Sequence, residues 1–270
     1  MAWSLKTTTD AGLAALMAVT CVALIWAALH APQPIDRTPP IPREPVSLDG
    51  AAVKGRDTAP VVVIAFADYQ CPACRKFETD TLPRLETAYI ATGQVQWAFR
   101  HHPIEQLHPA AVGGARAAAC AGARGRFWEM HEALFADPKN MDRPALLTRA
   151  TTIGLDARAM AACLDDASVA AAVQRDIDQA TALQLRGTPA FLVGHREPDG
   201  RVRVASVIPG AAPYDDFTAA IDSALAGPRR WQTRIVAGAG IGVLSAALAI
   251  AGLRRARRRR VAADASGLGG

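Results

Sequence analysis

The pattern of hydrophobic and polar positions beyond residue 60 predicts a strand, a helix and a second strand. Val61–Phe66 is a short, uninterrupted apolar run rich in β-branched residues, which is typical of a buried central strand. The charged, amphipathic stretch after Cys74 predicts a helix that bends at Pro83 and ends before Gly93. Val95–Phe99 alternates and predicts the second strand.

The pattern then becomes helical, and it returns to strands near residue 190. From about Pro109 to Leu185 the sequence is Ala-rich with helical periodicity, which predicts three or four helices and no strand. Ala190–Val193 and Val202–Val207 predict a hairpin with a turn at Pro198–Gly200. Tyr214–Leu225 predicts a last helix. The order of elements indicates an α/β fold with an inserted helical block.

Two uncharged apolar stretches, one near each end, are long enough to cross a bilayer. They are Ala11–Leu29 and Ile235–Leu253. Six arginines within Arg254–Arg260 follow the second stretch directly, and the positive-inside rule then assigns the C-terminus to the cytoplasm. With two spans both termini are cytoplasmic, and residues 31–233 are periplasmic or extracellular. We therefore predict a protein of the cell (inner) membrane, with two transmembrane helices.

Each apolar stretch has an alternative interpretation. The first could belong to a secretory signal peptide cleaved after Ala31, although Pro32 is a poor residue after a cleavage point. The second could be a buried core helix, and the arginines could form a nucleic-acid-binding tail. Their position directly beside an apolar stretch favours the membrane interpretation.

These observations divide the chain into five parts. We predict an N-terminal transmembrane anchor (1–30), an extended spacer with six prolines (31–46), a soluble domain (47–227) with a helical insertion at about 107–185, a C-terminal transmembrane helix (234–253) and an Arg-rich cytoplasmic tail (254–270).

The positive charge of the chain belongs to its ends. The formal net charge is +5, but residues 31–228 hold 20 Lys and Arg against 23 Asp and Glu, a balance of −3. The remaining residues hold 10 basic and 2 acidic side chains, a balance of +8. The soluble domain therefore gives no indication of a nucleic-acid partner.

Cys71 and Cys74 stand where the predicted strand gives way to the predicted helix. The first residue of a helix faces free backbone N–H groups and the positive end of the helix dipole, and both lower the pKa of a thiol. Pro72 suits the first helical turn, because its missing N–H costs nothing there. Cys74 lies within reach of Cys71, so the pair can form an exposed, readily attacked disulfide.

A CxxC motif alone has other interpretations. It is half of many zinc sites, but the sequence contains no second CxxC and no HxxxH, and His101 and His102 are adjacent. Two inert core cysteines would fit poorly with the polar residues that precede Cys71. We therefore predict a redox pair and no metal.

A second motif is Arg186–Phe191, with the sequence RGTPAF. A proline at the start of a strand is unusual, because it cannot donate a hydrogen bond to its neighbour. A cis bond between Thr188 and Pro189 would resolve this and expose the backbone of Thr188. An extended substrate segment could then pair with Thr188.

Together these motifs resemble the DsbA-like branch of the thioredoxin superfamily. The resemblance is carried by FADYQCPAC, LHPAA, CAGARGRFWEMHEALF and RGTPAFLV, over about residues 45–227. It implies a thioredoxin-like fold with an inserted helical block, Cys71 as the nucleophile, Cys74 as the resolving cysteine and Pro189 as a cis-proline facing them. It also implies exchange with thiol-containing exported proteins, a membrane redox partner that resets the pair, and no cofactor.

The chain departs from this family at two positions. Many DsbA oxidases have His where this chain has Ala73, and an acidic residue where it has Ala65. Asp68 is close to the site in another register. It could assist proton transfer, and a capping or surface role is the favoured alternative.

Other candidate residues lie in the helical block. Cys120 and Cys163 could be two buried small side chains or a structural disulfide, which an oxidising compartment and some relatives favour. His131 is expected in the core rather than in catalysis, and His108 at a helix entry rather than in the site. Cys21 lies within the first apolar stretch.

We therefore predict a thiol–disulfide oxidoreductase, and favour an oxidase over a reductase or isomerase. The isomerase is disfavoured because no dimerisation domain is evident. Two alternatives of another kind are a non-catalytic thioredoxin-like membrane adaptor or chaperone and a metal-binding sensor. Intact Cys71, Cys74 and Pro189 argue against the adaptor, and missing ligands argue against the sensor.

Overall fold

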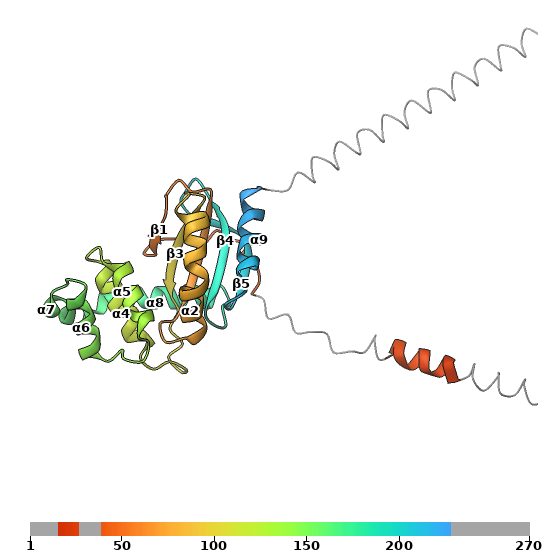
Figure 1. Cartoon of the computed structure of the whole chain (residues 1–270), viewed down its shortest axis with the longest axis horizontal. Coiled ribbons are helices and arrows are strands. Elements are labelled where there is room, and N and C mark those ends of the chain that lie inside the picture. Colours follow the sequence, from red (N-terminus) through yellow and green to blue (C-terminus); the bar gives the residue numbers. More distant parts are fainter. Residues whose placement is uncertain (1–15, 27–38, 228–270) are drawn as a thin grey trace, which may run out of the picture. The chain divides into compact units, whose positions relative to one another are not determined.

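The computed structural model describes two separate parts of the chain, residues 16–26 and 39–227 (Figure 1). Residues 16–26 form a helix with exposed apolar side chains. Within these two parts, no helix combines the length and the apolar character needed to span a bilayer. The first predicted span, 11–29, is only partly described, and the second, 234–253, lies outside the described residues.

A five-stranded sheet organises residues 39–227, with the strand order β1–β3–β2–β4–β5. The central strand β2 pairs parallel with β3 and antiparallel with β4, and all its residues are buried because helices cover both faces. The strands are β1 (Ala52–Lys54), β2 (Val61–Ala67), β3 (Val95–His101), β4 (Ala190–Arg196) and β5 (Val202–Pro209). This mixed sheet confirms the predicted α/β fold.

The helix that follows Cys71 runs without a break across one face of the sheet, beside α9 (Tyr214–Leu225) (Figure 1). Its segments are α2 (Pro72–Lys76), the π-helical turn η1 (Phe77–Thr81), α3 (Leu82–Leu85) and the π-helical turn η2 (Glu86–Ile90). Pro83 lacks an N–H and cannot continue the ordinary helical ladder, and wider turns flank it, as expected of a helix disturbed by proline.

The inserted block contains five helices in the described part of the chain, so the prediction of three or four was wrong. They are α4 (Ala111–Gly122), α5 (Phe127–Ala136), α6 (Arg143–Thr152), α7 (Ala157–Leu164) and α8 (Ala167–Ala182). The last three each begin at an aspartate whose side chain caps the first turn, after a connection of only a few residues. Such short connections interrupt the helical periodicity very little.

Two short features at the N-terminal edge of the domain were not predicted. Strand β1 has only three residues, and it pairs with Trp97–Phe99 of β3. Val46, the last residue of the predicted spacer, is 5% exposed and pairs with Val202 through two backbone hydrogen bonds of 2.8 Å. Residues just before position 47 therefore contribute to the folded unit.

The insertion is fastened to the sheet by a buried ion pair and closed within itself by a disulfide. The Asp176 carboxylate of α8 accepts hydrogen bonds from the Arg100 guanidinium (2.6 Å) and from the His101 backbone N–H (3.0 Å). Cys120 of α4 and Cys163 of α7 are joined by a disulfide.

Candidate active site

The candidate site lies in the turn between β2 and α2. Cys71 is the N-cap of α2, with an extended backbone (φ −71°, ψ 122°), and Pro72 begins the helix. Cys71 is 8% exposed, whereas Cys74, one turn further on, is 1% exposed. Neither is disulfide-bonded, so the structure represents the reduced pair.

The strand β4 brings a second chain segment against Cys71. The Thr188–Pro189 peptide bond is cis, and the Cys71 thiol donates a hydrogen bond of 3.3 Å to the carbonyl oxygen of Thr188. The Thr188 hydroxyl is buried as well. The two sequence motifs, 117 residues apart, therefore meet at one sulfur atom.

The surroundings give the two thiols opposite acidities. A hydrogen bond from the Cys74 thiol, aided by Thr188 and by the backbone N–H groups of Cys74 and Ala73, lowers the pKa of Cys71 to about 5 against an opposing effect of burial. Burial, followed by the interaction with Cys71, raises the pKa of Cys74 far above its ordinary value. At neutral pH the pair therefore holds a thiolate at Cys71 and a proton at Cys74.

The sequence favoured a capping or surface role for Asp68, and its exposure of 1% shows that the surface alternative is wrong. Its carboxylate accepts hydrogen bonds from the backbone N–H groups of Gln70 (2.7 Å) and Ile104 (2.8 Å) and contacts Nδ1 of His108 at 2.8 Å. Its own backbone N–H donates to Sγ of Cys74 at 3.5 Å. Asp68 thus holds the turn that carries both cysteines, and it draws His108 towards the site.

Gln70 connects the same turn to the insertion, which sequence reasoning missed. Its side-chain oxygen accepts from the Ala110 N–H at 2.7 Å, and its amide nitrogen donates to the Pro138 carbonyl at 3.2 Å. Arg75 adds a third link, a 3.3 Å hydrogen bond to the carbonyl of Ala136. A polar residue before a CxxC motif was the only signal in the sequence, and it names no partner.

His131 belongs to the core, as its position in the sequence indicates. It contacts the Tyr69 hydroxyl (3.2 Å) and the Glu78 carboxylate (3.1 Å), and its ring packs against Phe99 and Phe135. Among the residues that the structure describes, no group of three or more His, Cys, Asp or Glu side chains is arranged to hold a metal ion.

The sheet, the inserted helices and the cysteine pair beside a cis-proline define the class of DsbA-like proteins of the thioredoxin superfamily, whose members are thiol–disulfide oxidoreductases. The sequence profile of the family described as Thioredoxin matches residues 48–222. The chain belongs to this family.

Particular relatives support the same branch. The chain is 28% identical over 193 residues to disulfide bond formation protein D of Bacillus subtilis, and the match covers 67% of this chain and 80% of that protein. The oxidised crystal structure of BdbD from Bacillus subtilis superposes with a TM-score of 0.59 at 26% identity, covering 68% of this chain and 97% of that one.

A second group of relatives is much longer than the segment they share with this chain. The Na⁺/H⁺ antiporter NhaA 3 of Salinispora tropica is 32% identical over 163 residues, which is 60% of this chain and 24% of the antiporter. The chain thus spans about a quarter of the length of this relative. The likeness concerns a segment of the antiporter, not the whole protein.

Proposed function

We propose that the protein is a thiol–disulfide oxidoreductase that acts through Cys71 and Cys74, and that it oxidises exported proteins. The observation that carries the proposal is the asymmetry of the pair. Cys71, which is 8% exposed, is stabilised as a thiolate by the Cys74 thiol and by neighbouring backbone N–H groups, and the more deeply buried Cys74 retains its proton.

The reaction begins with the oxidised pair. A substrate thiolate attacks Sγ of Cys71, the Cys71–Cys74 bond breaks, and Cys74 leaves with the electron pair and takes up a proton. A second substrate thiolate then attacks the substrate sulfur of the mixed disulfide, and Cys71 leaves as a thiolate. Two electrons pass from the substrate dithiol to the protein, and a membrane redox partner removes them to restore the disulfide.

The lowered pKa of Cys71 favours this direction. A thiol whose pKa is lower in the folded, reduced protein than in a free chain stabilises the reduced state. The stabilisation is complete above the ordinary pKa of about 8.5 and is lost as the pH falls through about 5. At neutral pH about half of it remains, and the disulfide is therefore readily reduced by a substrate dithiol. Ala73 and Ala65 supply no histidine or carboxylate to this effect.

The reduction potential of the Cys71–Cys74 pair tests the oxidase assignment. We expect a potential clearly above that of thioredoxin, about −270 mV, when the full-length protein is equilibrated with glutathione buffers. Thiolate absorbance should rise with a midpoint near pH 5, and this transition should be absent from Cys71→Ser. A potential near −270 mV together with an ordinary thiol pKa would identify a reductase instead.

We also propose that the apolar segments Ala11–Leu29 and Ile235–Leu253 anchor the domain to the outer side of the cell membrane. Their lack of charge and the six arginines of Arg254–Arg260 support this location. The occurrence of a similar segment in a Na⁺/H⁺ antiporter, a membrane protein, is consistent with it.

A reporter enzyme that is active only outside the cytoplasm tests this topology. Fused after Gly270 it should be inactive, because the arginine-rich tail stays inside. Fused after Gly227 of a truncated chain, with the second apolar segment removed, it should be active. Strong activity of the Gly270 fusion would contradict the two-span topology.

A further inference from the structure

A groove beside the active-site helix is lined by residues of the thioredoxin-like core and of the inserted helical block. Its volume is about 290 Å³. Pro72 and Arg75 line it from α2, and Leu107, Pro138 and Lys139 line it from segments of the insertion. We call it the insertion groove. Gln70 and Pro72, the residues on either side of Cys71 in the chain, both line the groove, so it lies at the N-terminal end of the active-site helix; Thr188 is not among its lining residues.

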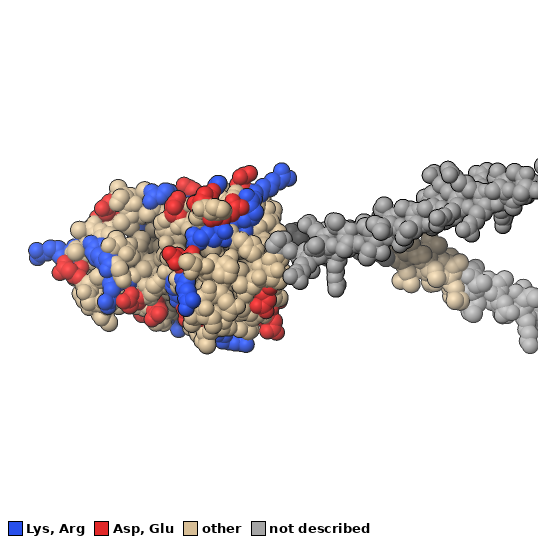
Figure 2. Space-filling view, turned by 90° about the horizontal axis from the view of Figure 1, so that it is seen from above, with Lys and Arg blue, Asp and Glu red and all other residues tan. Residues whose placement is uncertain are grey.

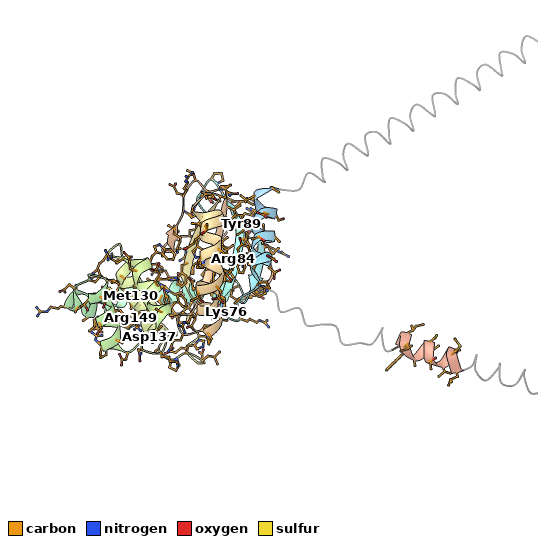
Figure 3. All side chains as sticks on the ribbon, in the orientation of Figure 1. Lys76, Arg84, Tyr89, Met130, Asp137 and Arg149 are labelled. Atoms are coloured by element: carbon orange, nitrogen blue, oxygen red, sulfur yellow. A yellow bond between two sulfur atoms is a disulfide. The ribbon has the colours of Figure 1, made fainter. Side chains whose placement is uncertain are left out.

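The groove presents positive charge without a carboxylate to neutralise it. Within residues 39–227, neither Arg75 nor Lys139 forms an ion pair, and the Arg75 guanidinium uses one donor on the Ala136 carbonyl. The carboxylate nearest in sequence to Lys139 is that of Asp137. It contacts the Arg149 guanidinium at 3.2 Å and accepts a hydrogen bond from the Asn140 amide at 2.8 Å. Figure 3 shows Asp137 and Arg149 together.

The other charged groups near the groove do not reverse its positive charge. His108 lines it but is bonded to the buried carboxylate of Asp68, and Glu105 is exposed outside the lining. On the face shown in Figure 2, basic and acidic side chains are interspersed, and residues 31–228 carry a balance of −3. A preference for acidic ligands would therefore come from the groove itself and not from the domain as a whole.

The groove also exposes an aliphatic side chain. Leu107 is 70% exposed, and Pro109 and Pro138 line the groove near it. An exposed leucine beside prolines offers apolar area that a partner can cover, and the two cations at the rim can then select the charge of that partner.

We propose that the insertion groove binds the substrate segment next to the reacting cysteine, and that it selects segments with an aspartate or glutamate and an aliphatic residue. This inference rests on the proposed oxidoreductase activity. An extended chain advances about 3.3–3.6 Å per residue, so side chains within about three positions of the substrate cysteine lie within about 10 Å of the reacting sulfur, and these are the side chains that we assign to the groove. The backbone of Thr188 remains free to pair with the substrate on the other side of that cysteine.

Matched reduced peptides test the selection. Each carries the same cysteine pair with a neighbouring leucine and either Asp, Asn or Lys within three positions of the first cysteine. The oxidised full-length protein is mixed with each peptide, and the loss of the Cys71–Cys74 disulfide is followed by acid quenching and alkylation. We expect the Asp peptide to react about fivefold faster than the Lys peptide at low ionic strength, and the ratio to shrink with added salt. A serine in place of the leucine should slow all three.

Reversing a charge in the groove tests whether the groove causes the preference for the Asp peptide. Lys139→Glu should remove or invert the preference, whereas Arg158→Glu, an exposed residue on α7, should leave it unchanged. The rate with dithiothreitol, which is too small to fill the groove, reports the chemistry alone. Two results overturn the inference and leave the oxidoreductase activity intact. One is a normal rate with dithiothreitol together with equal rates for the three peptides, and the other is an unchanged Asp-to-Lys rate ratio in Lys139→Glu. No reaction with dithiothreitol overturns both.

Discussion

Cys74→Ser should accumulate substrates as mixed disulfides on Cys71, and Cys71→Ser should accumulate none and lose activity by about a thousandfold or more. The physical reason is the asymmetry of the pair. Cys71 is the more accessible sulfur, at the N-cap, with its thiolate stabilised by neighbouring donors. Cys74 is almost fully buried, and its pKa is raised. A substrate can therefore reach only Cys71. In Cys74→Ser the lone Cys71 thiolate attacks a substrate disulfide and displaces one substrate thiolate, and the resulting mixed disulfide persists because the protein has no second thiol beside it to reverse the step.

Non-reducing gels of cells that express each variant measure this outcome, because trapped complexes run larger and collapse when a reductant is added. Cys21→Ser is the matched control, since Cys21 lies outside the folded domain and its loss should change neither trapping nor rate. Equal trapping by Cys71→Ser and Cys74→Ser would contradict the assignment of roles. Cys74→Ser replaces the thiol donor beside Cys71 by a hydroxyl donor, so the alkylation of Cys71 is best compared at several pH values.

The parts of the fold that the sequence predicts well are those whose signal is local. Val61–Phe66 has the pattern of a buried strand because β2 is covered on both faces, and the strand extends one residue further, to Ala67. Tyr214–Leu225 has the same bounds in the sequence prediction and in the structure. Cys71 and Pro72 mark a helix start through local backbone chemistry alone, and the sequence is therefore sufficient to place the motif there.

The features that were missed depend on contacts between distant residues. Strand β1 is too short to show a period, and it exists because Ala52 and Lys54 pair with β3. Asp68 has the sequence context of a turn residue, but its burial results from Ile104 and His108, which lie 36 and 40 positions further along the chain. The contacts of Gln70 span 40 and 68 positions. No single-sequence pattern encodes such pairs, and they are what joins the active-site turn to the insertion.

Reduction of the Cys120–Cys163 disulfide should lower the free energy of unfolding by about 2–5 kcal/mol. The bond joins α4 to α7 across a sequence separation of 43 residues, and a cross-link over a loop of that length removes conformational freedom chiefly from the unfolded chain; the loop-entropy relation gives about 4 kcal/mol. Cys120 is fully buried in α4, so the two freed thiols would also have to be accommodated in a closely packed interior.

For this measurement the active-site cysteines must be replaced, so that they do not react with the added reductant. In a Cys71→Ser and Cys74→Ser background the only remaining single cysteine is Cys21, so added reductant changes the Cys120–Cys163 bond alone. Denaturant unfolding of this full-length variant, with and without dithiothreitol, should give free energies of unfolding that differ by the predicted amount. The same chain with Cys120→Ala and Cys163→Ala added should be insensitive to dithiothreitol and as unstable as the reduced form.

Two alkylated thiols at positions 120 and 163 in protein isolated without reductant would show that the bond does not form. A difference below about 0.5 kcal/mol would show that it forms but contributes little, because the helices α4 and α7 are then held together by their packing.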